Sequence, residues 1–162
     1  MIDRHMVTSQ KFREVMGNFA TGITVVTTRG GDGQTYGLTV NSFTSVSLEP
    51  ILVLVCFDNR LSSLQHFKDS GKFGVSVLSD KQEDISRIFA RKDSERPASL
   101  YFDGPAGQPL IKNCLAYLEC ETVAAYPGGD HQIFLGKVIS GDVLDDKTGP
   151  VLYFRGKYQR LS

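Results

Sequence analysis

One of the three histidines in the chain stands beside an acid, at the start of a segment that alternates like a β-strand. Asp130 and His131 follow two glycines in the stretch YPGGDHQIFLGKV. Glycine frees the backbone for a flexible turn, and the alternation of apolar with polar or small residues after it predicts a strand. An imidazole at the mouth of a strand can hydrogen-bond an amide or a phosphate group of a ligand. The alternative interpretation is an ordinary histidine at the entry to a strand.

The stretch LTVNSFTSVS is unusually rich in hydroxyl and amide side chains for a strand. Thr39, Asn41, Thr44 and Ser45 stand among apolar residues there. Because successive side chains of a strand point to opposite faces, one polar face can line a cavity while the other packs in the core. The alternative is a half-exposed strand whose threonines and serines simply face the solvent.

Two further stretches contain groups that bind anions. Asp58, Ser62 and Ser63 follow the apolar run ILVLVCF, where a short helix is predicted to begin, and the N–H groups at a helix start attract anions. Arg91 and Lys92, in FARK, lie at the end of another predicted helix. The alternatives are a simple N-cap in the first stretch and cations that complement the helix dipole in the second. Together with the polar strand, these stretches provide the parts that a planar ligand with a phosphate needs.

Several other kinds of site are not indicated. The three cysteines (Cys56, Cys114 and Cys120) form no CxxC pair, and the histidines have no metal-ligand spacing, so we expect neither a metal site nor a disulfide framework. The glycines of RGGDGQTYG precede a strand rather than open a helix, so they predict a hairpin turn and not a dinucleotide fingerprint.

The elements that must position these side chains are mostly β-strands. Helices are predicted in SQKFREVMGNFATG, RLSSLQHFKDS and SDKQEDISRIFARK, the first with an apolar stripe of Phe12, Val15, Met16 and Phe19 that ends before Gly22. About seven strands are predicted, in ITVVTTR, TYGLTVNSFTSVSLEP, ILVLVCF, KFGVSVL, CLAYLECETVAAY, HQIFLGKVISGDVL and VLYFRGKYQRL. Short turns join most of them, without the regular βαβ alternation of a parallel sheet. The predicted class is therefore a mainly β, antiparallel barrel with two to three helices that plug or cap it.

Length and composition exclude several classes of protein. The 162 residues suggest a single domain, residues 1–162, and 41% of them are hydrophobic, which is typical of a globular chain. The formal net charge is zero, so we expect no bulk attraction to nucleic acid. No apolar run approaches the roughly 18 residues of a membrane span. The start, MIDRHMVTSQ, lacks the apolar region of a signal peptide, so we expect a cytoplasmic protein without a membrane partner.

The motifs of the chain occur in the order of one known family. They are, in sequence order, FATGITVVTT, GLTVNSFTSVSLEP, LVLVCFDN, KFGVSVL, FARK, GGDH before an apolar strand, and LYFRGKY. On these motifs the chain resembles, from about Phe12 to Leu161, the flavin reductases that form the small component of two-component flavin-dependent monooxygenases. Ile51 departs from the pattern, because members often have a second proline there, and we expect no effect of this difference on the chemistry.

The resemblance implies a fold, a reaction and a partner. The fold would be a split β-barrel of the flavin-reductase type, an antiparallel Greek-key barrel, in a homodimer. FMN or FAD would bind without a covalent link, and NADH or NADPH would reduce it by hydride transfer. The reduced flavin would then diffuse to a flavin-dependent monooxygenase. The choice between FMN and FAD depends on the room beyond the first phosphate.

The resemblance also implies roles for individual residues. Those of the flavin site are Thr39, Val40, Asn41 and Ser42 along the isoalloxazine and ribityl chain, Phe57 and Asp58 beside the flavin, and Ser62, Ser63, Arg91 and Lys92 at the phosphate. Asp130 and His131 would face the nicotinamide, with His131 as the catalytic residue that orients it rather than as a general acid. Tyr153 and Arg155 would close the pocket from the facing subunit.

Three other functions remain open on the sequence. A split-barrel FMN protein that transfers electrons or senses redox state would keep the flavin site without turning over NAD(P)H, and the GGDH motif argues against it. An oxidase of the related pyridoxamine-phosphate type needs a further basic cluster, which the sequence does not contain. A β-barrel without a cofactor would bind no flavin.

Overall fold

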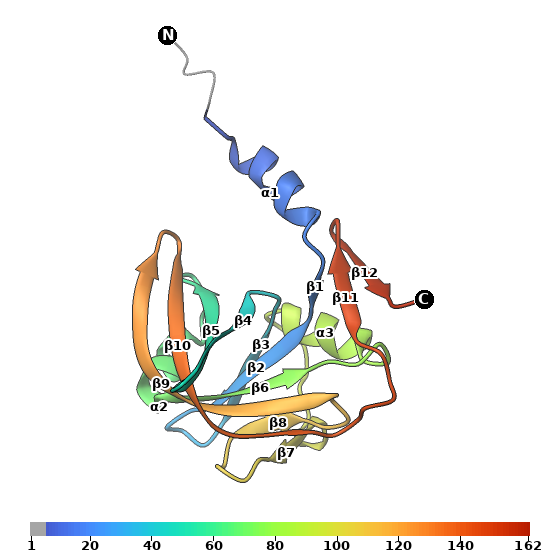
Figure 1. Cartoon of the computed structure of the whole chain (residues 1–162). Helices are drawn as coiled ribbons and strands as arrows, with labels where there is room; N and C mark the ends of the chain where they lie inside the picture. The colour runs from blue at the N-terminus through green and yellow to red at the C-terminus, as the bar shows by residue number, and fades with distance from the viewer. Residues whose placement is uncertain (1–5) are drawn as a thin grey trace.

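A seven-stranded antiparallel sheet forms the centre of the fold (Figure 1). The computed structural model describes residues 6–162, and the expectation that the chain begins without a signal peptide falls partly on residues 1–5, outside them. The strand order is β3-β2-β6-β9-β10-β5-β4. The strands are β2 (Thr24–Arg29), β3 (Thr35–Val40), β4 (Phe43–Leu48), β5 (Ile51–Asp58), β6 (Lys72–Val77), β9 (Ala116–Gly128) and β10 (His131–Val143).

Shorter elements cover this sheet and extend from it. The helices are α1 (Ser9–Gly17), α2 (Leu64–Ser70), α3 (Glu83–Ala90) and the 3₁₀ helix η1 (Ala98–Leu100). The remaining strands are β1 (Thr21–Gly22), β11 (Val151–Phe154) and β12 (Lys157–Arg160), which form one small sheet, and β7 (Tyr101–Asp103) and β8 (Pro109–Ile111), which form another. Among residues 6–162, no helix is long and apolar enough to cross a membrane.

The two larger clusters of buried hydrophobic residues lie on opposite faces of the large sheet. Val25 and Val26 are neighbours on β2, so their side chains point to opposite faces. Val26 belongs to the cluster that contains Phe57 and Phe67 of α2, with ring centroids 4.7 Å apart. Val25 belongs to the cluster around Phe89 of α3. Burying a phenylalanine side chain stabilises a fold by about 1.5–3 kcal/mol, so each face has its own helix fixed by an aromatic anchor.

The predicted class, mainly β and antiparallel with two to three helices, is confirmed in the described residues. The sheet is open there, because its edge strands β3 and β4 are not hydrogen-bonded to each other. The long strand predicted over residues 35–50 is interrupted by a bend at Asn41 and Ser42. The last predicted strand is also two strands, because Arg155 and Gly156 form a turn with φ of 49° and 76°. Although its sequence is a continuous apolar run, β5 alternates between buried and partly exposed residues and is not buried on both faces.

α1 extends away from the sheet (Figure 1), and none of its residues is buried. The hydroxyl of Thr8 accepts the backbone N–H of Lys11 at 3.1 Å and so caps the helix. The helix ends at Gly17, earlier than the predicted stop at Gly22, which lies in β1. The exposed fractions of the predicted stripe are 58% for Phe12, 59% for Val15, 47% for Met16 and 69% for Phe19.

Candidate functional site

A cavity of about 710 Å³ lies between the edge strand β3, the end of α3 and the loop that follows β5. The residues predicted for the flavin site that line it are Thr39, Asp58, Ser62, Ser63, Arg91 and Lys92. Its volume is in the range of pockets that bind small molecules and cofactors. The fold therefore gathers hydroxyl groups, a carboxyl group and cations from separate stretches around one space.

The strand wall of this cavity is β3, which is held against α3. The hydroxyl of Thr39 donates to the carbonyl oxygen of Ser86 at 2.6 Å. Gly37 permits this approach, because a Cβ there would lie 3.0 Å from the ring of Phe89 and from Cγ2 of Thr27. In the described sheet β3 pairs only with β2, so apart from the carbonyl oxygen of Gly37, which accepts a hydrogen bond from Arg96, its outer backbone groups are not used by another strand.

Asp58, the last residue of β5, is held by the arginine two residues later. Its carboxyl group accepts the backbone N–H of Arg60 at 2.8 Å and guanidinium N–H groups at 2.7 and 3.1 Å. These hydrogen bonds from Arg60 hold the pKa of Asp58 well below its usual range, so the group is ionised at neutral pH. Arg60 also lines the cavity and was not predicted from the sequence.

The residues that follow α3 form the cationic side of the cavity. Arg91 is the C-cap of the helix, and neither Arg91 nor Lys92 forms an ion pair within residues 6–162. The hydroxyl of Ser63 makes no capping hydrogen bond to α2. Because α2 has only seven residues, attraction of an anion here depends on the hydroxyl groups and the cations, and not on the helix start that the sequence suggested.

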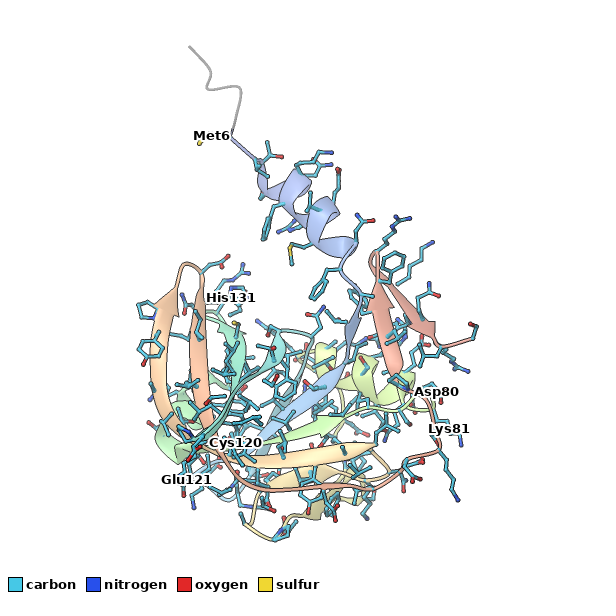
Figure 2. The ribbon with its side chains drawn as sticks, in the orientation of Figure 1. Met6, Asp80, Lys81, Cys120, Glu121 and His131 are labelled. Atoms are coloured by element: carbon cyan, nitrogen blue, oxygen red, sulfur yellow. The ribbon has the colours of Figure 1, made fainter. Side chains whose placement is uncertain are left out.

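His131 lies at the tip of the β9–β10 hairpin (Figure 2). It is the cross-strand partner of Asp58, and its Nδ1 lies 2.7 Å from the carboxyl group of Asp130. The hairpin tip is tied to the loop after β5, because Asn59 donates to the carbonyl oxygen of Gly129 and receives a hydrogen bond from Gln132. Hydrogen bonds therefore connect the turn that contains the two glycines to the loop after β5.

The remaining predicted residues do not line the cavity: Val40, Asn41, Ser42, Phe57, Asp130, His131, Tyr153 and Arg155. Val40 and Phe57 are buried in the core, so only their backbone groups can reach a ligand. Ser42 connects the bend after β3 to β5, since its hydroxyl donates to the carbonyl oxygen of Cys56 at 3.0 Å and accepts the N–H of Cys56 at 3.3 Å.

Tyr153 and Arg155 lie in the C-terminal hairpin, at the base of α1. The rings of Tyr153 and Tyr158 meet edge to face, with centroids 5.6 Å apart. Nε of Arg155 donates to the side chain of Asn18 at 2.8 Å, and its backbone N–H donates to the carbonyl oxygen of Gly17 at 2.8 Å. Neither residue reaches the cavity of its own chain, and closure of a pocket on a facing subunit stays a prediction.

Two more residues of the cavity wall, Tyr36 and Arg96, were missed from the sequence. Tyr36 stacks on His66 with ring centroids 3.7 Å apart, and its hydroxyl donates to Asp32 at 2.6 Å. Arg96 ties the segment after α3 to β3 through the carbonyl oxygen of Gly37 at 2.7 Å. No local signal marks either residue, because a tyrosine in a strand and an arginine in a loop are ordinary.

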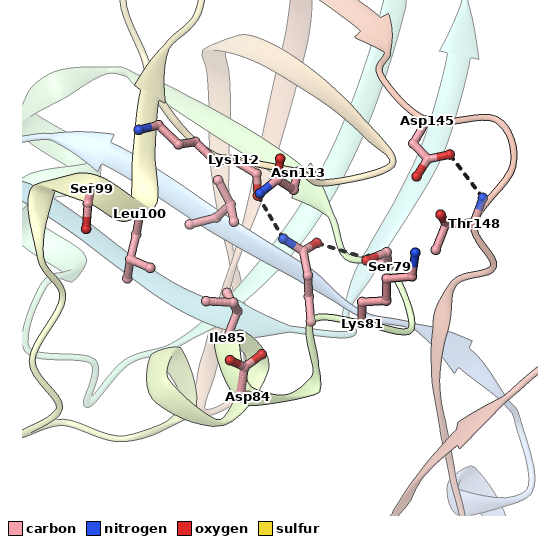
Figure 3. Close-up of a pocket in the computed structure, with 12 residues that line it drawn as sticks. Ser79, Lys81, Asp84, Ile85, Ser99, Leu100, Lys112, Asn113, Asp145 and Thr148 are labelled. Carbon is pink, nitrogen blue, oxygen red and sulfur yellow. Dashed lines mark hydrogen bonds between the residues drawn. The ribbon is translucent and has the colours of Figure 1, made fainter.

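A separate cavity of about 500 Å³ lies at the start of α3 and contains none of the predicted residues (Figure 3). Gln82 accepts the backbone N–H of Ser79 at 3.1 Å and donates to the carbonyl oxygen of Lys112 at 2.8 Å. The first of these bonds is one half of a capping box between Ser79 and Gln82. The amide of Gln82 is therefore occupied within the fold and is not free for a ligand.

Similarity to known proteins points to one family. A model described as "Flavin reductase like domain" matches residues 16–162. The reductase subunit HsaB of a flavin-dependent monooxygenase from Mycobacterium tuberculosis is 40% identical over 149 residues, which are 91% of this chain and 79% of that protein. An NADH-dependent FAD reductase from Streptomyces globisporus is 41% identical over 160 residues, which are 94% of this chain and 85% of that protein.

A solved structure gives the same result for the fold. The NADH:FAD oxidoreductase SgcE6 of Streptomyces globisporus, in complex with NAD and FAD fragments, has a TM-score of 0.89 and 37% identity. The match covers 98% of this chain and 97% of that one. The resemblance seen in the sequence motifs is thus confirmed, and the chain belongs to the flavin reductase like domain family.

Proposed function

We propose that the chain is an NAD(P)H-dependent flavin reductase that reduces FMN or FAD and supplies the reduced flavin to a partner monooxygenase. The observation that carries this proposal is the cavity of about 710 Å³, where an edge strand, hydroxyl groups and cations meet. These are the groups that a planar ring with a phosphate-bearing tail needs. The relatives described above support it, because one is named a reductase subunit of a flavin-dependent monooxygenase and another an NADH-dependent FAD reductase.

When bound, the flavin and the nicotinamide supply the redox chemistry, and this chain supplies binding and orientation. Thr39 and the outer backbone groups of β3 would hydrogen-bond the ring and the ribityl chain. The backbone groups of Val40, Asn41, Ser42 and Phe57 and the carboxyl group of Asp58 would lie along the same side. Ser62, Ser63, Arg91 and Lys92 would hold the phosphate by hydrogen bonds and opposite charge.

Asp130 and His131 would orient the nicotinamide. An ionised carboxyl group accepts a hydrogen bond, so Asp130 favours a proton on Nδ1 of His131. Nε2 is then free to accept a hydrogen bond from an amide in the neutral form, or to donate one in the protonated form. Because hydride transfer between the two cofactors would need no proton from the protein, His131 would act by position.

We further propose that residues 1–162 form a single domain with a split, Greek-key barrel, that it works in the cytoplasm, and that two copies associate. The three thiols are free, which suits a reducing compartment. A short helix is marginal in water unless its apolar face is covered, and α1 leaves its stripe uncovered. Leu48, on the edge strand β4, is also 90% exposed. A second copy that covers these residues would place Tyr153 and Arg155 against the partner.

Light scattering after size-exclusion chromatography tests the association. We expect twice the mass of one chain for the wild type and a shift towards the monomer for a Phe12→Ser, Met16→Ser double variant. Arg13→Gln, on the same helix but outside the apolar stripe, is the matched control and should remain dimeric. A wild-type protein that is monomeric at micromolar concentration would contradict the proposal.

The reductase function is tested by mixing purified protein with NADH or NADPH and with FMN, FAD or riboflavin, and following the nicotinamide absorbance. We expect rapid oxidation with a preferred pair of cofactors. Tight flavin binding without oxidation would instead favour a redox carrier or sensor. Absence of flavin binding would contradict both functions.

A further inference from the structure

A further cavity, of about 410 Å³, adjoins the candidate flavin cavity at the far end of β3. Thr35 and Arg96 line both cavities, so the two spaces meet at these residues. The rest of the second cavity is formed by the turn between β2 and β3, which includes Gln34, and by β7, which includes Tyr101. None of the residues predicted from the sequence for flavin or nicotinamide binding lines it.

Arg96 is a partly buried cation that forms no ion pair within residues 6–162. Its Nη1 donates to the carbonyl oxygen of Gly37 at 2.7 Å, and its Nη2 donates to that of Arg91 at 2.8 Å. The guanidinium also lies 4.7 Å above the ring of Phe89. Burial lowers the pKa of Arg96, because the surroundings solvate its charge poorly. A guanidinium has five N–H donors, so an anion at the junction would still find unused donors and an uncompensated charge.

Two buried polar atoms at this place have no hydrogen-bond partner in the described residues: Nε of Arg96 and the hydroxyl oxygen of Tyr101. Leaving a buried polar group unpaired costs about 1–3 kcal/mol. The other charges of the second cavity, Arg29 and Asp103, form an ion pair with each other. Arg96 is therefore the source of net positive charge in the second cavity.

We propose that Arg96 and the second cavity bind the second phosphate and the adenosine of a flavin dinucleotide, so that this chain binds FAD in preference to FMN. The inference rests on the proposed reductase function, because it extends the same flavin site. FMN ends at its single phosphate, for which Ser62, Ser63, Arg91 and Lys92 are already proposed. The additional half of FAD must continue beyond that phosphate.

The geometry of β3 indicates where this half would lie. From Thr39 to Thr35 the strand advances by four residues, or about 13 Å at about 3.3 Å per residue. Gly37, whose carbonyl oxygen binds Arg96, is midway between them. A ligand with its ring near Thr39 and its tail along the strand passes Arg96 and reaches the second cavity.

NADH also contains an adenosine diphosphate group, so the chemistry of Arg96 alone suits either nucleotide. FAD is favoured because the second cavity continues from the one lined by Arg91 and Lys92. Asp130 and His131, which are proposed to orient the nicotinamide, line neither cavity.

Calorimetric titration with FAD and with FMN tests the proposal without relying on turnover. We expect the wild type to bind FAD at least tenfold more tightly than FMN, and Arg96→Gln to reduce this ratio at least fivefold. Because Arg96 also holds β3, Gln34→Glu is the second variant: its side chain is exposed and makes no hydrogen bond within residues 6–162, and the substitution adds a negative charge to the second cavity. In Gln34→Glu, the ratio of FAD affinity to FMN affinity should fall at least threefold. Gln159→Glu, on β12 and away from both cavities, is the control with the same charge change.

The outcomes separate this inference from the reductase function. Equal affinity of the wild type for FAD and FMN, or equal ratios in Gln34→Glu and Gln159→Glu, would overturn the adenosine site even if NADH is oxidised. FAD-selective binding without oxidation of either NADH or NADPH would support the site and contradict the reductase. A higher KM for NADH in Gln34→Glu, measured with FMN as acceptor and with FAD affinity unchanged, would assign the cavity to NADH and overturn the proposal.

Discussion

Glu119 is a fully buried carboxyl group on β9 that fixes the turn between β7 and β8. Its oxygens accept the N–H of Ala106 at 2.9 and 3.1 Å and the N–H of Gln108 at 2.9 Å. Gly104 lies so close that a Cβ there would be 2.5 Å from the carboxyl carbon. Because β7 carries Tyr101, this contact also positions a wall of the second cavity.

The expected effect of Glu119→Ala follows from these contacts. A hydrogen bond to a charged group contributes about 1.5–3 kcal/mol, and two separate backbone N–H groups would lose their acceptor. We therefore expect the free energy of unfolding to fall by about 3–5 kcal/mol. For a chain of this length each kcal/mol corresponds to about 2–4 °C, so the Tm should fall by about 6–20 °C. Glu119→Gln keeps one acceptor oxygen and should cost about 1–2 kcal/mol.

Thermal and urea unfolding at a fixed protein concentration measure this effect. Glu121→Gln is the matched control, because Glu121 lies on the same strand two residues later and is exposed (Figure 2). Its unfolding free energy should stay within about 0.5 kcal/mol of the wild type. Equal losses for Glu119→Gln and Glu121→Gln would refute the reasoning, because the buried contacts would then contribute nothing.

Three further predictions concern the site, the thiols and acid stability. His131→Ala should raise the KM for NADH about 2- to 12-fold, the value of one hydrogen bond, with a smaller change for flavin; unchanged kinetics for both would contradict its role. Burial raises the pKa of Cys120 to about 12, so at pH 8 a thiol reagent should modify the partly exposed Cys56 first, and Cys120 only after unfolding. Equal rates for Cys120 in native and urea-unfolded protein would be inconsistent with its burial. Hydrogen bonds from Thr148 and the N–H of Lys147 lower the pKa of Asp145 from 3.8 to about 2 (Figure 3). The unfolded chain therefore binds this proton more readily, so Asp145 stabilises the fold above about pH 4 and this contribution is lost as the pH falls towards 2. The difference in unfolding free energy between wild type and Asp145→Asn should shrink over that range, and a constant difference would contradict it.

Much of the local structure was predictable, because it depends on neighbouring residues. The β-branched run ITVVTTR is β2, and the glycines after it form the β2–β3 turn with Gly33 at a φ of 78°. Gly71, which directly follows the predicted helix RLSSLQHFKDS, ends α2 in the left-handed region. The bend at Asn41 and Ser42 was missed, since alternation continues across it and two consecutive strands read as one.

The candidate site was predictable only in part. Thr39, Ser63 and Arg91 could be chosen from the sequence because each has a hydroxyl group or a positive charge. In the structure all three line one cavity. Phe57 has the type expected beside a flat ring, but strand alternation turns its side chain into the core.

The sequence by itself determined the strand-rich class, the apolar stripe of α1, the polar strand and the family motifs, because periodicity, turn residues and motif order are properties of short segments. Only the tertiary structure decided that β3 is an edge strand, that the segment after α3 returns to it, and that Arg96 stands where two cavities meet. These features depend on the order of strands in the sheet. That order results from the packing of residues far apart in the chain, which leaves no local pattern at Arg96 itself.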